Sequence, residues 1–422
     1  MKQGMTMAEK VLARGSDRDI VRPGEFVTAK IDILIANDLS FYDAAELMDQ
    51  IGQNKVWDTD KIVVVIDHHV PASEIRYAEH HKKMREHAKL YGIRNLYDAG
   101  VGICNQLLPE KGHSLPGRLI VGGDSHTGTS GAMGAAACGI GVSEVVYVMV
   151  KGYLWFQVPE TIRFVLKGSL PKGISSKDIL LYIAGQYTAE VAQYKAIEFT
   201  GPAAKALSIG QRLTMSNMGV ELGAKFTLFE ADDKTMAYLK GRTDQPIKPF
   251  GPDPDAQYLA VYEIDVSTLE PQIACPHNVD NVKPISNIGE VLVHQAFIGS
   301  CTSSRTEDLE QAAAILKGKR VHPGTRLLVI PASCEVYIDI VKSGALQTLL
   351  ESGAMIATPG CGPCGGHHMG VLAPGETAIS STNRNFKGRM GSPESLLYLA
   401  SAETVAASAI EGKIADPRKY LG

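Results

Sequence analysis

The sequence lacks the features that mark nucleic-acid-binding, disulfide-stabilised and membrane-spanning proteins. Its 42 Lys and Arg residues against 46 Asp and Glu residues give a formal net charge of −4, so no basic surface is available for nucleic acid. The seven cysteines are few and odd in number, which excludes a disulfide framework and favours a reducing, cytoplasmic location. Residues 1–16 contain no apolar signal segment, and the longest apolar runs, such as residues 62–66, are too short to cross a membrane. We therefore expect a soluble globular protein with neither a nucleic-acid nor a membrane partner.

Aromatic residues are also scarce, at 6%, whereas glycine is abundant, with 42 residues. This combination is typical of packed α/β proteins with many tight turns and backbone-lined sites. A chain of 422 residues is too long for one hydrophobic core. Changes in composition predict three α/β domains with mostly parallel sheets, over residues 1–160, 161–280 and 281–422.

Four predicted strand ends in the first 130 residues carry polar side chains. They are Asn37-Asp38, Asp67-His68, Asn105-Gln106 and Asp124-Ser125-His126. Open α/β sheets bind their ligands at the carboxyl ends of the strands. One such pair is weak evidence, but four of them predict a shared cleft.

Two further expectations concern the surface and the local structure of this first unit. Residues 73–91 are rich in charge and predict a solvated helix, so His80, His81 and His87 are expected at the surface. Residues 96–105 predict a strand followed by a turn.

Three cysteines stand in loops of glycine, proline and small hydroxyl residues. Cys301 follows a predicted strand at residues 291–298, and Cys361 and Cys364 follow another at residues 353–357. Small residues let the backbone approach a bulky inorganic group and turn N–H groups toward its sulfurs. Three thiolates are one fewer than a [4Fe–4S] cluster usually has, which would leave one iron open as a Lewis acid.

Other interpretations of these cysteines remain open from their spacing alone. The Cys361/Cys364 pair is also typical of a redox motif, or of half a zinc site that His367 and His368 would complete. Buried cysteines beside glycine often serve only to pack a core.

Arg384 and Arg389 lie in an Asn- and Gly-containing loop after the cysteines. A guanidinium group is planar and matches a carboxylate through two parallel hydrogen bonds. The loop therefore predicts carboxylate recognition, with an ordinary solvated surface loop as the alternative.

Seven motifs occur in order along nearly the whole chain. They are Asn37-Asp38, Asp67-His68, Gly123-Asp124-Ser125-His126-Thr127, Ser216-Asn217-Met218-Gly219-Val220-Glu221, Gly299-Ser300-Cys301-Thr302, Cys361-Gly362-Pro363-Cys364 and Asn383-Arg384-Asn385-Phe386-Lys387-Gly388-Arg389. Together they resemble the aconitase superfamily, and within it the branch of 3-isopropylmalate dehydratase large subunits and homoaconitase-type enzymes. The resemblance implies three aconitase-like domains around a central cluster cleft, without the swivelling fourth domain.

The resemblance also implies roles for particular residues. Cys301, Cys361 and Cys364 would ligate a [4Fe–4S] cluster with one open iron, and Asp67 with His68 would handle the proton of the leaving hydroxyl. The remaining catalytic residues, around the iron-bound water, would be Asp124, His126 and Glu221. The substrate-binding residues would be Asn37, Ser125, Asn217, Asn383, Arg384 and Arg389.

Two positions depart from the family pattern. Asn105 stands where a histidine is usual, and Ser303 stands where an asparagine is usual. An asparagine does not transfer protons near pH 7, so the water network, the substrate range or the rate is expected to differ.

The expected activity is that of a hydro-lyase acting on a hydroxy di- or tricarboxylate, most closely 3-isopropylmalate in leucine biosynthesis. Homoaconitate, 2,3-dimethylmalate, citramalate and maleate are the alternative substrates. A Ser-Ser-Arg segment typical of the swivelling domain is not found late in the chain, so a small partner subunit is expected to supply it with the serine base. A cluster-free RNA-binding relative and a zinc hydrolase are the competing classes.

Overall fold

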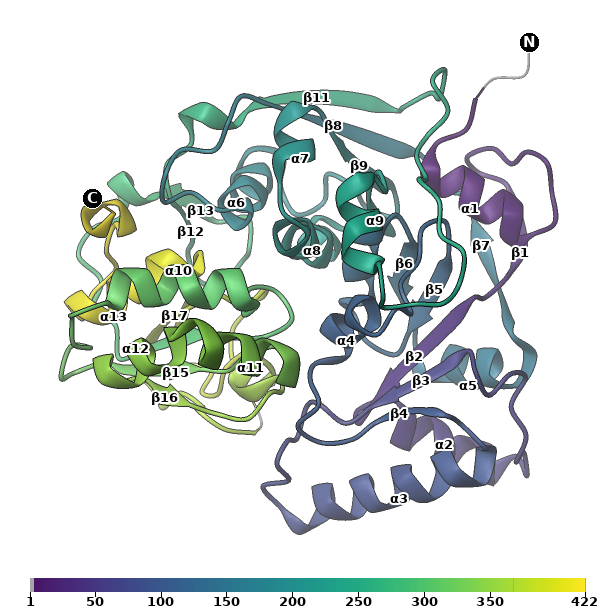
Figure 1. The fold of residues 1–422 in the computed structure, drawn as a ribbon, viewed down its shortest axis with the longest axis horizontal. Coiled ribbons are helices and arrows are strands. Elements are labelled where there is room, and N and C mark those ends of the chain that lie inside the picture. Colours follow the sequence, from purple (N-terminus) through teal and green to yellow (C-terminus); the bar gives the residue numbers. More distant parts are fainter. Residues whose placement is uncertain (1–3, 367, 422) are drawn as a thin grey trace.

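In the computed structural model, residues 4–366 and 368–421 are described, and their strands form three mostly parallel sheets and one two-stranded ribbon (Figure 1). The five-stranded sheet has the order β4-β3-β2-β5-β6, the four-stranded sheet β10-β9-β8-β11, and the seven-stranded sheet β13-β12-β18-β17-β14-β15-β16. Among the strands of the described residues, antiparallel pairing is confined to the β1–β7 ribbon and to β12 with its two neighbours; isolated antiparallel bridges also lie outside the strands. The predicted α/β class with mostly parallel sheets is therefore confirmed.

The strands are β1 (Phe26–Lys30), β2 (Ile33–Asn37), β3 (Ile62–Val65), β4 (Asn95–Tyr97), β5 (Leu119–Gly122), β6 (Ala136–Gly139), β7 (Tyr153–Gln157), β8 (Thr161–Lys167), β9 (Ala196–Thr200), β10 (Phe226–Phe229), β11 (Ala260–Asp265), β12 (Gln272–Ala274), β13 (Val282–Pro284), β14 (Gln295–Ile298), β15 (Arg326–Val329), β16 (Met355–Ile356), β17 (Thr377–Ser380) and β18 (Leu396–Leu399). The α-helices are α1 (Met7–Gly15), α2 (Phe41–Gln50), α3 (Ile75–Tyr91), α4 (Cys104–Glu110), α5 (Val142–Lys151), α6 (Ser176–Tyr187), α7 (Pro202–Ala206), α8 (Ile209–Met218), α9 (Asp233–Leu239), α10 (Thr306–Leu316), α11 (Cys334–Ser343), α12 (Ala345–Ser352) and α13 (Ala402–Glu411). Short 3₁₀ segments near the site are η1 (Thr127–Met133), η2 (Gly219–Leu222) and η5 (Gly362–Gly365).

The five-stranded sheet is buried on both faces, which explains why its strands read as continuous apolar runs. Successive residues of β2 point to opposite faces. Leu34 and Ala36 pack with α2 and α5, whereas Ile33 and Ile35 pack with α4. The predicted strand and turn at residues 96–105 is wrong in part, because the chain enters α4 at Cys104 to cover this second face.

The third sheet divides its side chains in the same way. Ala296 and Ile298 of β14 pack with Leu309 of α10 and Val405 of α13. Phe297 points the other way, into the core cluster of the four-stranded sheet. The four-stranded and seven-stranded sheets therefore share one continuous core.

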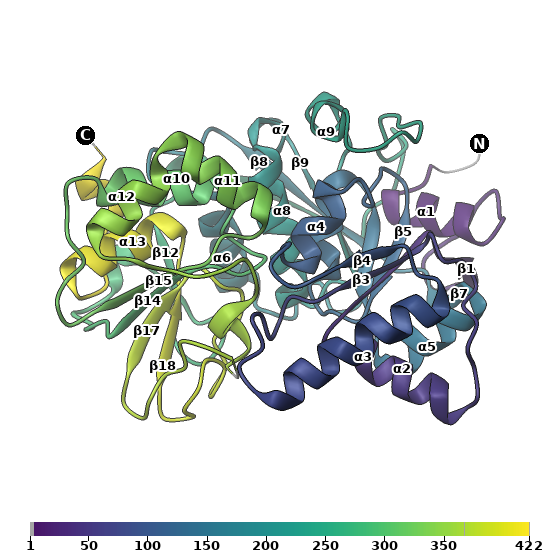
Figure 2. The same ribbon diagram turned by 60° about the horizontal axis from the view of Figure 1, so that its bottom comes forward.

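The sheets lie around a common centre. In Figures 1 and 2 the five-stranded sheet (purple to blue) and the seven-stranded sheet (green to yellow) lie on opposite sides, with the four-stranded sheet (teal) between them. The division into three domains stays a prediction; the sheets themselves span residues 33–139, 161–265 and 272–399. Among the residues that the structure describes, no helix combines the length and apolarity that crossing a membrane requires.

Gly131 in η1 offers a test of this packing. A Cβ atom there would lie 1.7 Å from the carbonyl oxygen of Thr227 in β10, whereas Gly289 has nothing within 4 Å. Gly131→Ala is expected to lower the free energy of unfolding by about 3 kcal/mol, because backbone must move to relieve the overlap. Gly289→Ala is the matched control and is expected to melt with the parent protein. Equal thermal melts for both variants would contradict the packing of η1 against β10.

Candidate active site

The turn that follows β3 holds a carboxylate–imidazole pair. Asp67 Oδ1 lies 2.7 Å from His68 Nδ1, and Asp67 Oδ2 accepts a 2.7 Å hydrogen bond from the backbone N–H of Cys104. Asp67 is 1% exposed. Because both carboxylate oxygens are engaged, Asp67 fixes the orientation of the His68 ring and leaves its Nε2 facing the cleft.

Asp38, at the end of β2, holds this turn from behind. Its carboxylate accepts hydrogen bonds from the backbone N–H groups of Asp67 (3.2 Å), His68 (2.9 Å) and His69 (2.9 Å). The carboxylate also lies 3.4 Å from His69 Nδ1 and 3.5 Å from His81 Nε2. Burial raises the pKa of Asp38, but the three histidine side chains outweigh it and hold that pKa well below its usual value.

The predicted surface position of His81 is wrong, since its ring is buried against Asp38. His80 and His87 are partly exposed. The sequence did carry a signal for His81: it belongs to the buried stripe Tyr77, His81, Met84, Ala88 and Tyr91, which follows the helical period.

His68 is surrounded by acidic groups. Burial lowers its pKa, but the Cys361 thiol group, Asp67 and Asp38 together raise it well above the usual value. A raised pKa favours the protonated ring, which is the form that is able to donate a proton to a departing hydroxyl.

Asp124, directly after β5, is held by amide donors. Its Oδ1 accepts hydrogen bonds from Asn105 Nδ2 (2.7 Å) and from the backbone N–H of His126 (2.8 Å), and its Oδ2 accepts one from Asn37 Nδ2 (3.2 Å). His68 Nε2 lies 3.8 Å from Asp124 Oδ2. Of the predicted strand-end residues, Asn37, His68, Asn105, Asp124, Ser125 and His126 line one cavity, Asn105 from the first turn of α4 instead of from a strand end. Gln106 does not join them, because its side chain bonds to Glu110 and Arg305.

A second network joins His126 to the arginine loop. His126 Nε2 lies 3.0 Å from Glu221 Oε1, and Arg384 Nε donates to the same oxygen at 2.7 Å. Arg384 Nη1 donates to Ser125 Oγ at 3.0 Å. Burial raises the pKa of Glu221, but His126 and Arg384 outweigh it and bring the pKa below its usual value.

Asn217 and Glu221 do not share one helix face, because α8 ends at Met218 and Glu221 lies in η2. Glu221 points to His126, whereas Asn217 Nδ2 donates to Cys301 Sγ at 3.1 Å. The break after Met218 sends the two side chains to different parts of one site.

The three cysteines of the predicted ligand set are unpaired thiols, 7–8% exposed, and they line one cavity. Asn383 Nδ2 lies 3.8 Å from Cys301 Sγ, and Arg389 Nη2 lies 3.5 Å from Cys364 Sγ. The backbone N–H of Cys361 donates to the carbonyl of Asp67 at 2.9 Å. The thiols of the third sheet thus face the carboxylate–imidazole pair of the first sheet.

Two backbone features shape the thiol loops. Ser300, before Cys301, has a φ of +71°, a left-handed conformation that costs about 1 kcal/mol or more for a residue with a side chain. Gly366, after Cys364, has a φ of +73°, and a Cβ atom there would lie 2.5 Å from the carbonyl of Arg389. Such strain is typical of functional loops that the surrounding structure holds in place.

The cavity has a volume of about 180 Å³. The predicted site residues in its lining are Asn37, His68, Asp124, Ser125, His126, Cys301, Cys361, Cys364, Asn383, Arg384 and Arg389. The three others contact that lining directly: Asp67 through His68, Glu221 through His126, and Asn217 through Cys301. The structure therefore brings together every residue that the sequence suggested for the site.

The donor set fits an iron–sulfur cluster. Burial raises the pKa of Cys301 to about 12 and that of Cys361 well above its usual value, so these thiols need a cation to ionise. Amide and guanidinium N–H groups point at two of the sulfurs, as they do around thiolate ligands. For the zinc alternative, His367 lies outside the described residues; His368 Nε2 is engaged by the carbonyl of Pro71 at 2.7 Å, and its buried Nδ1 has no hydrogen-bond partner among the described residues.

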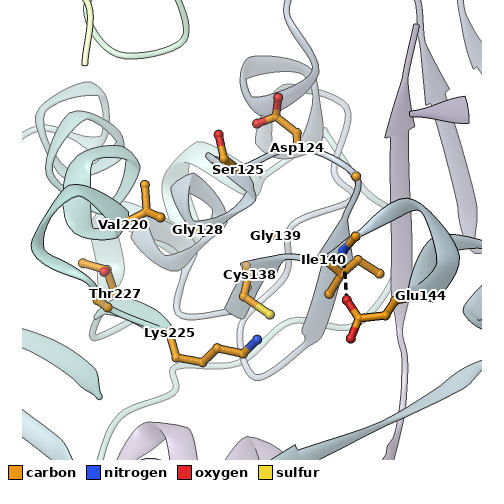
Figure 3. A pocket seen from close by; sticks show the side chains of 14 residues that line it. Asp124, Ser125, Gly128, Cys138, Gly139, Ile140, Glu144, Val220, Lys225 and Thr227 are labelled. Atoms are coloured by element: carbon orange, nitrogen blue, oxygen red, sulfur yellow. Dashed lines mark hydrogen bonds between the residues drawn. The ribbon is translucent and has the colours of Figure 1, made fainter. Parts of the chain in front are cut away.

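A larger hollow, of about 400 Å³, lies beside the same loop and shares Asp124 and Ser125 with the cysteine cavity (Figure 3). Its wall includes Cys138, toward which the amine of Lys225 points (Figure 3). The three converging thiols and both arginines line the smaller cavity instead. The predicted site residues therefore gather in the smaller cavity.

Comparison with known proteins agrees with this geometry. The model of the aconitase family (aconitate hydratase) matches residues 9–412. The chain belongs to the aconitase family. The predicted resemblance is thereby confirmed.

Relatives within the aconitase family match along nearly their whole length. A 3-isopropylmalate dehydratase large subunit 1 of Methanopyrus kandleri is 49% identical over 418 residues, covering 99% of this chain and 100% of the relative. A probable 3-isopropylmalate dehydratase large subunit of Methanothermobacter thermautotrophicus is 48% identical over 413 residues, covering 98% and 99%. A 3-isopropylmalate dehydratase large subunit 1 of Pyrococcus furiosus is 47% identical over 421 residues, covering 99% of each.

The lowered pKa of Glu221 predicts a pH-dependent stability. A carboxylate with a depressed folded-state pKa stabilises the fold fully above its unfolded value, 4.5, and loses this contribution as the pH falls through the folded value. Glu221→Gln is expected to lower the free energy of unfolding by about 2 kcal/mol near pH 7, with the difference from the parent shrinking below pH 4.5. Glu263→Gln, at the exposed Lys167–Glu263 pair, is the control and is expected to change little at either pH. Denaturant melts at both pH values check this, and a deficit that persists at low pH would contradict it.

Proposed function

We propose that this chain is the large, catalytic subunit of a two-subunit hydro-lyase that removes water from, and returns it to, a hydroxy dicarboxylate. The observation that carries the proposal is the single cavity in which three thiols, the Asp67–His68 pair and two arginines meet. The relatives named as 3-isopropylmalate dehydratase large subunits support the reaction and the division into subunits.

Cys301, Cys361 and Cys364 would hold a [4Fe–4S] cluster. When bound, the cluster supplies a Lewis-acidic iron with one open coordination position. The amide of Asn217 and the guanidinium of Arg389 would keep their contacts to the sulfurs.

The Asp67–His68 pair would act on the leaving hydroxyl. Asp67 holds His68 Nδ1 at 2.7 Å, and the raised pKa of His68 favours the protonated ring. As the C–O bond breaks, Nε2 donates its proton and the hydroxyl leaves as water. Asp124, His126 and Glu221 would orient that water, since hydrogen bonds join the three side by side: the N–H of His126 donates to Asp124, and His126 Nε2 lies 3.0 Å from Glu221.

The arginines would bind the substrate carboxylates. Arg389 Nε has no hydrogen-bond partner among the described residues, although it is buried, so it retains a donor for a carboxylate. Arg384 shares Glu221 with His126, and a substrate carboxylate would compete for that guanidinium. Asn37, Ser125 and Asn383 would complete the polar lining.

The proton on carbon needs a further base. Within the cavity Asp67, Asp124 and Glu221 already accept charged or amide hydrogen bonds. A small partner subunit with a swivelling domain would supply a serine base and a further arginine, and would close the cleft against water.

We propose 3-isopropylmalate as the substrate. Leu39 and Ile103 are the aliphatic residues of the cavity lining, and they suit an isopropyl group, which is larger than the methyl groups of 2,3-dimethylmalate and citramalate. Homoaconitate, 2,3-dimethylmalate, citramalate and maleate are the acids to compare.

Replacing each cysteine by serine tests the ligand set. Cys301→Ser, Cys361→Ser and Cys364→Ser are each expected to lose the open-iron cluster when the protein is reconstituted without air. Cys138→Ser and Cys334→Ser are the matched controls, since Cys138 is buried outside the cavity and Cys334 is exposed on α11. Iron and acid-labile sulfide are the quantities to measure. Equal iron in all five variants, or stoichiometric zinc in the parent, would contradict the ligand set.

Assays with and without the small subunit test whether that subunit supplies the base for the carbon-bound proton. The reconstituted chain alone is expected to turn over 3-isopropylmalate at least about 10²-fold more slowly than with its small subunit, because the carbon-bound proton lacks its base. Enoate absorbance reports the rate for each acid in turn. Full activity of the chain alone would show that the base lies in this subunit.

A further inference from the structure

Two buried cations lie behind the cysteine cavity. Arg305 is 5% exposed and Lys177 is 1% exposed. In the part of the chain that the structure describes, neither nitrogen group lies within 4.0 Å of a carboxylate oxygen; their hydrogen bonds go to neutral groups. A buried charge without a direct ion-pair partner is costly, so neighbouring acidic groups are needed to stabilise it, and Asp178 and Asp308 are two such groups.

Arg305 fixes the loop that carries the first thiol. Its Nη2 donates to the carbonyl of Cys301 at 2.7 Å, and its Nη1 donates to the carbonyl of Thr302 at 2.7 Å. The same guanidinium donates to Thr214 Oγ1 of α8 and to Gln106 Oε1 of α4, both at 3.1 Å. One side chain therefore ties Cys301 to helices of the other two sheets.

Lys177 of α6 fixes the neighbouring loop. Its Nζ donates to the carbonyls of Ser381, at 2.5 Å, and Thr382, immediately before Asn383. Ser381 Oγ in turn accepts a 3.0 Å hydrogen bond from the backbone N–H of Gly299. The two cations thus hold adjacent loops by their carbonyl oxygens.

We propose that Arg305 and Lys177 are positioning residues for the cluster: they lock the Cys301 loop and the loop before Asn383, and they supply the positive charge that buried thiolates require. The identity of the cluster rests on the proposed function, whereas the locking of Cys301 by Arg305 does not.

The charges of the site agree with this role. Burial raises the pKa of Cys301, and Arg305 acts against that rise. Burial lowers the pKa of Lys177 to about 7, and Asp178, Asp308 and then the thiol groups of Cys364 and Cys301 act against that fall. The two buried cations therefore face both carboxylates and thiol groups.

The geometric part is tested by replacing Arg305 with Met or Lys. Arg212, on α8, is the matched control because it is 1% exposed and binds Asp232 through two hydrogen bonds, of 2.9 and 2.6 Å. In air-free reconstituted protein, Arg305→Met is expected to lose iron about 10- to 100-fold faster than the parent, as for other groups that support metal ligands. Arg212→Met is expected to lower the melting temperature without changing iron release.

Cluster-free protein gives an independent readout. Iodoacetamide labelling, mapped by peptide mass spectrometry, is expected to modify Cys301 faster in Arg305→Met and Arg305→Lys than in the parent, with Cys361 as the internal reference. Lysine keeps the positive charge but lacks the two guanidinium donors that bind the carbonyls of Cys301 and Thr302. Both variants are therefore expected to release the Cys301 loop. If the parent binds no iron, the proposed function fails, yet this labelling still decides whether Arg305 holds Cys301.

The charge part is tested by the reduction potential of the cluster. Arg305→Met and Lys177→Met are each expected to shift it to more negative values, whereas Arg305→Lys and Arg212→Met leave it in place. Unchanged Cys301 labelling together with parental iron release in Arg305→Met would overturn the locking role. A potential that moves equally in Arg212→Met, or in none of the variants, would overturn the charge role.

Discussion

The site depends on a few backbone hydrogen bonds that join the ends of the first and third sheets. The N–H of Cys361 donates to the carbonyl of Asp67 at 2.9 Å, the N–H of Ile103 donates to Ala332 at 2.9 Å, and the N–H of Cys334 donates to Val101 at 2.8 Å. These contacts set the separation between the thiol loops and the carboxylate–imidazole pair. Residues almost 300 positions apart become parts of one cavity because of them.

Around that junction, a supporting shell orients each group in the cavity. Asp38 holds the turn of Asp67 and His68, amides hold Asp124, and Arg305 holds the Cys301 loop. Nearly all of these contacts end on backbone groups or buried amides, which move little. Such preorganisation is what places a proton donor and metal ligands within reach of one substrate.

Much of this arrangement could be predicted from the sequence. Apolar strands that end in polar residues predicted the shared cleft, and small residues around the cysteines predicted loops that approach a bulky group. The match to the aconitase family confirmed the resemblance that the ordered motifs suggested. These features depend on neighbouring residues in the chain, so they can be predicted from local sequence patterns.

The rest depends on tertiary contacts that local patterns do not encode. Packing against the first sheet determines which face of α3 is buried, and His81 lies on that face. The apolar stripe from Tyr77 to Tyr91 indicates the same face in the sequence. Glu221 does not lie on the same helix face as Asn217, because α8 ends at Met218 and Glu221 belongs to η2. In the sequence Arg305 is an ordinary charged residue before a helix. Only in the folded chain do α4, α8 and the Cys301 loop meet at its guanidinium.

The central claim is that three thiols of this chain hold a cluster whose remaining iron meets the substrate. Mössbauer spectra of protein reconstituted with ⁵⁷Fe and its small subunit, recorded with and without 3-isopropylmalate, test it most directly. We expect the signal of one iron site to change on adding the acid while the other sites stay as they were. A protein that binds no iron, or spectra that the acid leaves unchanged at every site, would contradict the claim.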